Sequence, residues 1–173
     1  MTRSGLAAGT LAVGAVLLLL MDRQADQATR EHCVGAWTRS TESEAAFVMS
    51  ALAHKNDLLV VERFGALAKR DDLAYAVVCD AAGRARFHTD AANVGKVYDS
   101  AVARRAMAAT LTQVQDLADA GVVEVDVPVG GGSVLRMGFG TRGLAASSGW
   151  LWSGAAASIL SAAAAVLLVR ARA

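Results

Sequence analysis

The chain carries long apolar runs near both ends and places nearly all of its charges between them. The first run, from Gly5 to Met21, is uncharged, and its 17 residues nearly cover a hydrocarbon core of about 30 Å at about 1.5 Å of helix per residue. The second run, 143–169, is uncharged for 27 residues and carries Trp150 and Trp152 where an interfacial aromatic belt is expected. Two transmembrane helices are therefore predicted, at 5–21 and 143–169. A cleaved signal peptide is the alternative for the first run.

Basic residues at both ends predict the orientation of these spans. Arg3 precedes the first run, and Arg170 and Arg172 follow the second. Under the positive-inside tendency, this pattern favours cytoplasmic termini. The predicted order is a cytoplasmic N-terminus (1–4), the first span, an extracytoplasmic domain (22–142), the second span and a cytoplasmic tail (170–173). In a bacterium, such a chain lies in the inner membrane, in contact with lipid, with its central domain in the periplasm.

The segment after the first run has the composition of a helix. Residues 22–70 are rich in Ala, Glu, Gln, Arg and Leu and contain no proline, which predicts one long helix or a pair of helices. Val60, Phe64 and Leu67 recur at i, i+4 and i+7, the spacing of a core-facing stripe. A polar cluster interrupts the apolar pattern before them, so a second helix capped near Asn56 is predicted.

From residue 73 onward, the pattern changes to one that is typical of strands. The runs LAYAVVCD and ARFHTD, joined by a turn at Gly83, predict one hairpin. The runs VVEVDVPV and SVLRMGFG, joined by three glycines, predict another. Between the hairpins we expect a loop at 90–97, a helix capped by Ser100 that extends through Met107, and a strand at 111–115.

Alternation in the first strand of the second hairpin predicts how the sheet is covered. Val123, Val125 and Val127 share one face, and Glu124 and Asp126 share the other, which is the pattern of a strand half covered by a core. Because consecutive elements tend to lie side by side, the simplest arrangement is an α+β fold. It consists of an antiparallel sheet with helices on one side.

Two stretches carry a family resemblance: NDLLVVERFGALAKRDDLAYAVVCDAAGRARFHTDAANVGKVYD, and VVEVDVPVGGGSVLRMGFG leading into the second apolar run. They resemble the Cache family, the PAS-like extracytoplasmic sensor domains of bacterial chemoreceptors and sensor kinases, over roughly residues 56–140. The resemblance implies a PAS-like antiparallel sheet with a long N-terminal helix, a homodimer formed through that helix, and a small-molecule ligand. Such receptors continue past the second span into an output domain, whereas this chain ends at Ala173. A membrane signalling partner is therefore expected to supply the output.

The resemblance also implies a set of ligand-binding residues. In relatives that sense citrate and dicarboxylates, the first hairpin and the loop after it supply cationic and polar groups to a carboxylate, and RFHTDAANVGK is similar to that region. Arg86, His88, Thr89 and Lys96 are the candidates carried over, for an organic acid. Arginine offers a bidentate fork to such a ligand and lysine a point charge. Alternatively, Arg86 is a solvated hairpin charge and His88 packs against the loop.

Composition and motifs argue against other classes of function. With 17 basic and 16 acidic residues, the formal net charge is +1, which gives no electrostatic reason to expect a nucleic-acid partner. Cys33 and Cys79 are too few for a disulfide scaffold, and with three scattered histidines they predict neither a zinc site nor any other metal site. Both cysteines are therefore expected to be unpaired thiols. A disulfide between the Cys33 residues of two copies of the chain, in an oxidising compartment, is the alternative.

Catalytic motifs are missing from the sequence as well. Gly138, Gly140 and Gly143 satisfy G-x-G-x-x-G, but the helix that follows them is the predicted second span, so the βαβ unit of a dinucleotide site is lacking. There is no G-x-S-x-G or H-E-x-x-H sequence. We therefore expect no enzyme activity, no catalytic residue and no cofactor.

Two functions remain after these exclusions. In the first, the domain binds a small solute and passes a conformational signal to a partner protein. In the second, it is a ligand-free PAS-like interaction or assembly module, or an accessory subunit of a membrane complex, because a fold alone does not determine a function.

Overall fold

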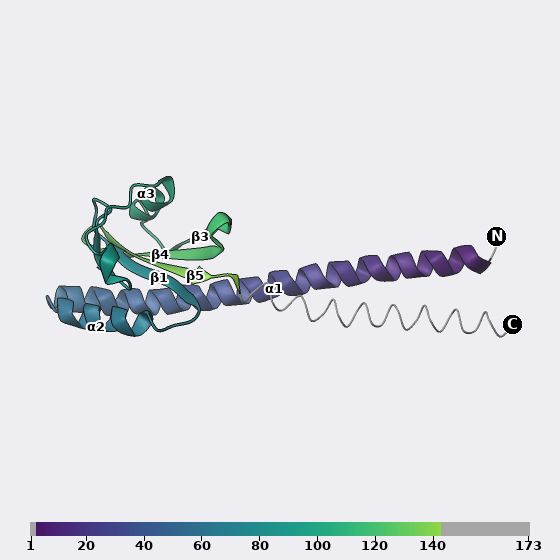
Figure 1. The fold of residues 1–173 in the computed structure, drawn as a ribbon, viewed down its shortest axis with the longest axis horizontal. Coiled ribbons are helices and arrows are strands. Elements are labelled where there is room, and N and C mark those ends of the chain that lie inside the picture. The colour runs from purple at the N-terminus through teal and green to yellow at the C-terminus, as the bar shows by residue number, and fades with distance from the viewer. Residues whose placement is uncertain (1–2, 143–173) are drawn as a thin grey trace. The chain divides into compact units, whose positions relative to one another are not determined.

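The structure is a computed structural model that describes the backbone of residues 3–142 and the side chains of residues 20, 21 and 23–142. It divides into two compact units, residues 1–32 with 142–173, and residues 33–141. The elements in chain order (Figure 1) are α1 (Arg3–Ala53), α2 (Asp57–Leu67), β1 (Leu73–Cys79), β2 (Ala85–His88), the 3₁₀ turn η1 (Ala91–Asn93), α3 (Ala101–Met107), β3 (Gln113–Leu117), the 3₁₀ turn η2 (Ala118–Ala120), β4 (Val122–Gly130) and β5 (Ser133–Gly140).

In the first unit, the structure describes backbone that belongs to α1. The predicted first span, 5–21, is helical throughout as part of this element. The predicted second span, 143–169, and the tail at 170–173 lie outside the described residues. Within the described part of the chain, no helix is both long enough and apolar enough to cross a membrane.

In the second unit, the five strands form one antiparallel sheet in the order β2-β1-β5-β4-β3. The two predicted hairpins are present as β1–β2 and β4–β5, so the predicted α+β class with an antiparallel sheet and a long N-terminal helix is confirmed. The predicted strand at 111–115 lies two residues too early, because β3 begins at Gln113 and ends at Leu117.

The helix boundaries follow from local capping chemistry. The Asn56 side chain accepts a hydrogen bond from the Leu59 backbone N–H at 3.3 Å and caps α2, as predicted. The side chain of Ser100 caps α3 in the same way, by accepting from the Ala103 N–H at 3.1 Å. Lys55 has a φ of 53°, and this left-handed residue separates α1 from α2.

One face of the sheet packs on α1 and α2 (Figure 1). Trp37 of α1 stacks on Phe139 of β5, with 5.1 Å between ring centroids and 7° between ring planes. The ring centroids of Phe64 in α2 and Phe87 in β2 lie 6.3 Å apart. The buried α2 residues are those of the predicted stripe, Val60, Phe64 and Leu67.

The other face of the sheet is also covered, which corrects the expectation that helices lie on one side only. Figure 1 shows α3 on the side of the sheet opposite α1 and α2. Tyr98, before α3, and Met107, at its end, pack against Val77, Cys79 and Ala85. The sheet is therefore a middle layer, and residues that the sequence assigned to solvent lie in a second interior.

Candidate functional site

Charged side chains gather on the sheet face beneath α3. In the strand register, Asp126 of β4 lies opposite Arg136 of β5, while Glu124 of β4 and Tyr75 of β1 both lie opposite Gly138 of β5. Alternation along the strands directs these side chains away from α1 and α2. Glu124 and Asp126 are 0% exposed and Arg136 is 5% exposed, so the prediction that β4 has one solvated face is wrong. Partners on neighbouring strands and the cover above them explain why these charges lie inside.

Hydrogen bonds join the buried charges into one system. The Arg136 Nη2 group donates to the two carboxylate oxygens of Glu124 at 2.9 and 2.8 Å, and the Tyr75 hydroxyl donates to the same carboxylate. Arg136 Nε lies 3.6 Å from Asp126 Oδ1. Gln115 of β3, 7% exposed, donates from Nε2 to Asp126 Oδ2 at 2.6 Å. We call these five residues the buried network, and they connect β3, β4, β5 and β1.

The network holds two carboxyl groups but one guanidinium. Burial and the charge of Glu124 raise the pKa of Asp126 to about 7, although the Gln115 hydrogen bond and Arg136 oppose this shift. Burial and Glu124 also raise the pKa of Tyr75, so its hydroxyl stays a donor. Asp126 is therefore the member of the network whose charge changes near neutral pH.

The segment around α3 forms the cover of the network. The Tyr98 ring centroid lies 5.7 Å from the Arg136 guanidinium carbon, a cation–π distance. Cys79 lies in the apolar part of the same layer, and burial raises the pKa of its thiol. Within the described residues of the chain, Cys79 and Cys33 form no disulfide with each other.

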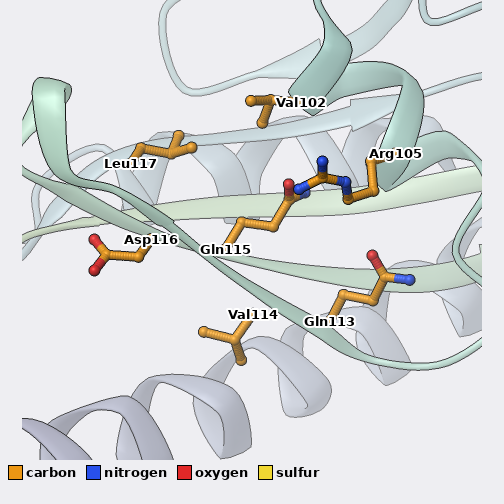
Figure 2. A pocket seen from close by; sticks show the side chains of 7 residues that line it. All are labelled: Val102, Arg105, Gln113, Val114, Gln115, Asp116 and Leu117. Atoms are coloured by element: carbon orange, nitrogen blue, oxygen red, sulfur yellow. The ribbon is translucent and has the colours of Figure 1, made fainter.

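A pocket of about 410 Å³ opens next to the network, between α3 and β3. Figure 2 shows the side chains that line it, namely Val102 and Arg105 from α3 and Gln113, Val114, Gln115, Asp116 and Leu117 from β3. Gln115 belongs to both the pocket and the buried network. We call this cavity the α3–β3 pocket.

Some buried polar atoms at this site lack a hydrogen-bond partner. Among the described residues these atoms are Gln115 Oε1, Asp126 Oδ1 and Arg136 Nε. Asp126 Oδ1 and Arg136 Nε face each other at 3.6 Å, too far for a good hydrogen bond. Gln115 Oε1 is the unpaired atom whose residue lines the pocket. A donor brought into the pocket can supply the bond that this oxygen lacks.

Arg86, the first of the four residues predicted from the resemblance, lies away from this pocket. A register shift between Val78 and Cys79 leaves it at an irregularity in the β1–β2 pairing, and its side chain is exposed. Its Nη2 atom lies 3.7 Å from Asp57 Oδ2, and its guanidinium carbon lies 5.5 Å from the Phe87 ring centroid.

The other three predicted residues make local hydrogen bonds. His88 Nδ1 accepts from the Asp90 backbone N–H at 2.8 Å, and burial lowers its pKa although Asp90 opposes this. Thr89 Oγ1 accepts from the Ala76 N–H at 3.1 Å, and Lys96 Nζ donates to Asn93 Oδ1 at 2.5 Å. None of the four lines the α3–β3 pocket, and their role in ligand binding stays a prediction.

Comparison with known proteins adds no assignment. The chain matches no protein-family model, no curated protein and no solved structure. Within the described residues, no group of His, Cys, Asp and Glu side chains is arranged to hold a metal ion.

The sequence contained a signal for the site that alternation alone did not reveal. Glu124 and Asp126 form a Glu-x-Asp pair in one strand of the clearest predicted hairpin, and Arg136 lies in the other strand. A hairpin closed at Gly130–Gly132 brings that arginine opposite the acidic pair. Opposite charges in register on one face are compatible with burial as well as with solvent exposure.

Proposed function

We propose that this chain is a membrane-anchored extracytoplasmic sensory domain that binds a small solute in the α3–β3 pocket and passes a conformational signal to a partner protein. The observation that carries the proposal is Gln115, whose amide joins the pocket to the buried network and keeps one oxygen unpaired. An antiparallel sheet with a long N-terminal helix is also what the Cache resemblance implies.

The pocket has the size and chemistry of a solute site. Its volume of about 410 Å³ falls in the range of about 300–1,000 Å³ in which small ligands are bound. A buried acceptor without a partner costs about 1–3 kcal/mol, and a ligand that donates to Gln115 Oε1 recovers part of this energy. Val102 and Leu117 supply apolar wall. Solute binding at this place therefore has a physical driving force.

The buried network offers a route from the pocket to α1. It begins at Gln115 of β3 and reaches Arg136 of β5 through Asp126. On the opposite face, β5 packs on α1 through the stack of Phe139 on Trp37. A solute that favours one arrangement of the network shifts the population of two packings of α1 on the sheet.

Anchoring and assembly complete the proposal. The uncharged runs at 5–21 and 143–169 are proposed to anchor the domain in the bacterial inner membrane. The resemblance adds a homodimer through the N-terminal helix and a signalling protein that receives the output. A displacement of α1 is then the signal that passes along the chain to that partner.

A screen of small metabolites against the full-length chain in detergent tests the proposal. A solute that binds the native state raises the midpoint of thermal unfolding. Val102→Trp fills the pocket and is expected to abolish this rise, whereas Arg104→Trp, at an exposed position of α3 that does not line the pocket, preserves it. The proposal fails if no solute raises the midpoint, or if the rise survives Val102→Trp.

The interaction module is the second candidate, and an exposed apolar surface on α2 favours it. Leu58 and Val61 are 66% and 55% exposed and lie three residues apart, so they share one side of the helix. If the chain is an interaction module, the double substitution Leu58→Lys and Val61→Lys is expected to dissociate its complex with a partner protein, and Val102→Trp is expected to leave that complex intact. If Val102→Trp abolishes solute binding and the double substitution leaves the complex intact, the sensor is supported.

A further inference from the structure

The polar groups of the α3–β3 pocket indicate the class of solute that it accepts, and this inference rests on the proposed function. Gln115 supplies a carbonyl oxygen that is buried and unpaired. Arg105 supplies a guanidinium, which contains donors and no acceptor. In Figure 2 the two side chains extend from β3 and α3 toward the same part of the pocket.

The buried network determines which end of the Gln115 amide is available. Nε2 donates to Asp126 Oδ2 at 2.6 Å. Because Asp126 Oδ2 accepts this hydrogen bond, the amide nitrogen faces Asp126. The amide oxygen is then the end left for a ligand.

Each kind of charged ligand group is opposed by one side of the pocket. A carboxylate would bring acceptor oxygens against Gln115 Oε1, with Asp126 and Glu124 behind it and a single Arg136 to balance them. An ammonium would satisfy Gln115 Oε1 but would be repelled by the Arg105 guanidinium. Asp116 also lines the pocket, but Figure 2 shows its carboxylate extending away from Gln115 and Arg105, so it does not offset this repulsion there. A group that carries both a donor and an acceptor without net charge meets neither penalty.

We infer that the α3–β3 pocket selects a small uncharged solute in which an N–H or O–H donor lies beside an oxygen acceptor, as in a carboxamide. The donor bonds to Gln115 Oε1, and the acceptor receives a hydrogen bond from Arg105. This class differs from the organic acid that the resemblance implies, because the predicted residues Arg86 and Lys96 do not line this pocket.

Three probes with the same four-carbon skeleton separate these possibilities: butyramide, butyrate and butylammonium. The thermal unfolding midpoint of the full-length chain in detergent is measured with each probe at equal millimolar concentration and equal ionic strength. Butyramide is expected to raise the midpoint most. A larger rise with butyrate or butylammonium overturns the inference but leaves the proposed function standing, since a solute has still bound.

Two substitutions change the expected order in opposite directions. Gln115→Met removes the acceptor, so the rise in the unfolding midpoint with butyrate is expected to equal or exceed the rise with butyramide. Arg105→Gln removes the guanidinium, so the rise with butylammonium is expected to exceed the rise with butyrate. Because Arg105 is exposed, its substitution leaves a folded chain even if Gln115→Met does not.

The failures of the two proposals are distinguishable. If none of the three probes acts but the metabolite screen finds a solute that Val102→Trp blocks, the inferred class is wrong and the site is right. If Arg105→Gln leaves the order of the three midpoint rises unchanged, the Arg105 guanidinium does not determine which probe the pocket prefers. If neither the probes nor the screen gives a rise, both proposals fall.

Discussion

Tyr75 lies across Gly138, and the ring occupies the space that a side chain on β5 would need. A Cβ atom added to Gly138 would lie 2.5 Å from Tyr75 Cε1 and 2.7 Å from Cζ. The absence of that atom lets the Tyr75 hydroxyl reach Glu124 across β5. Gly138 is therefore required by the buried network, in addition to any role in leading the chain toward the predicted second span.

Gly138→Ala is expected to destabilise the domain by about 1–3 kcal/mol, because the tyrosine ring must move and its hydrogen bond to Glu124 is lost. Gly140→Ala is the matched control in the same strand, since no atom lies within 4 Å of the added Cβ. Chemical denaturation of the full-length chain measures both. Equal losses of unfolding free energy in the two variants would show that the Tyr75 ring can move aside and that its hydrogen bond to Glu124 does not require a glycine at position 138.

The buried ion pair is expected to be costly to break from one side. Arg136→Met leaves Glu124 and Asp126 buried without a cation, so a loss of about 3–5 kcal/mol is expected. Arg136→Met combined with Glu124→Gln and Asp126→Asn is expected to recover most of this loss, because no buried charge remains.

A more exposed pair on the same unit is the control for this experiment. Arg70 donates to Asp72 at 2.8 Å, and both side chains are partly exposed. Asp72→Asn is therefore expected to cost at most about 1 kcal/mol. If Arg136→Met lowers the free energy of unfolding no more than Asp72→Asn does, the ion pairs of the buried network do not stabilise the second unit.

Stability is expected to fall as the pH rises toward neutrality. The pKa of Asp126 is raised from 3.8 to about 7 in the folded chain, so between these values the folded state holds a proton that the unfolded state has lost. This contribution is fully present below about pH 4 and is lost as the pH rises through about 7. Glu124, Arg136 and Tyr75 are the titratable or charged side chains that face it in the network.

Asp126→Asn tests this sign directly. The amide cannot ionise, so the part of the pH dependence between about pH 4 and 7 is expected to disappear from the unfolding curve. Asp72→Asn is again the control, because Arg70 holds the pKa of Asp72 below its usual value, and burial opposes this shift only in part. Loss of the Asp72 carboxylate is expected to remove stability at neutral pH instead. An unchanged profile in Asp126→Asn would mean that Asp126 is ionised throughout.

The elements of the second unit were largely predictable from sequence because they depend on local signals. Asn56 and Ser100 cap their helices through side-chain acceptors, and glycines at Gly83 and 130–132 adopt positive φ in the turns. The strand pattern then predicts the antiparallel sheet. These features are encoded within a few residues of the place where they act.

The site was not predictable in the same way because it depends on contacts between distant residues. Alternation showed that Glu124 and Asp126 share a face of β4, but it could not show that α3 and Tyr98 cover that face. Nor could it show that Gln115 reaches Asp126 across the sheet. The resemblance directed attention to Arg86 and its loop, whose side chains make local contacts.

The proposed orientation of the chain in the bacterial inner membrane is tested by protease treatment of intact cells. If the termini are cytoplasmic, protease is expected to cut exposed loops of the central segment, 22–142, after the outer membrane has been made permeable and while the inner membrane is still intact. A chain with a tag after residue 173 is expected to keep that tag protected under the same conditions. A central segment that resists until the inner membrane is broken would reverse the orientation.

NMR spectroscopy of the full-length chain in detergent can follow the side-chain amide of Gln115 and so report whether a solute binds in the α3–β3 pocket. When a solute that raises the unfolding midpoint is added, the Gln115 amide resonances are expected to shift, while those of the exposed Gln27 in α1 stay in place. The shift is expected to vanish in Val102→Trp. If the solute leaves the Gln115 resonances unmoved, the α3–β3 pocket is not where this protein binds it.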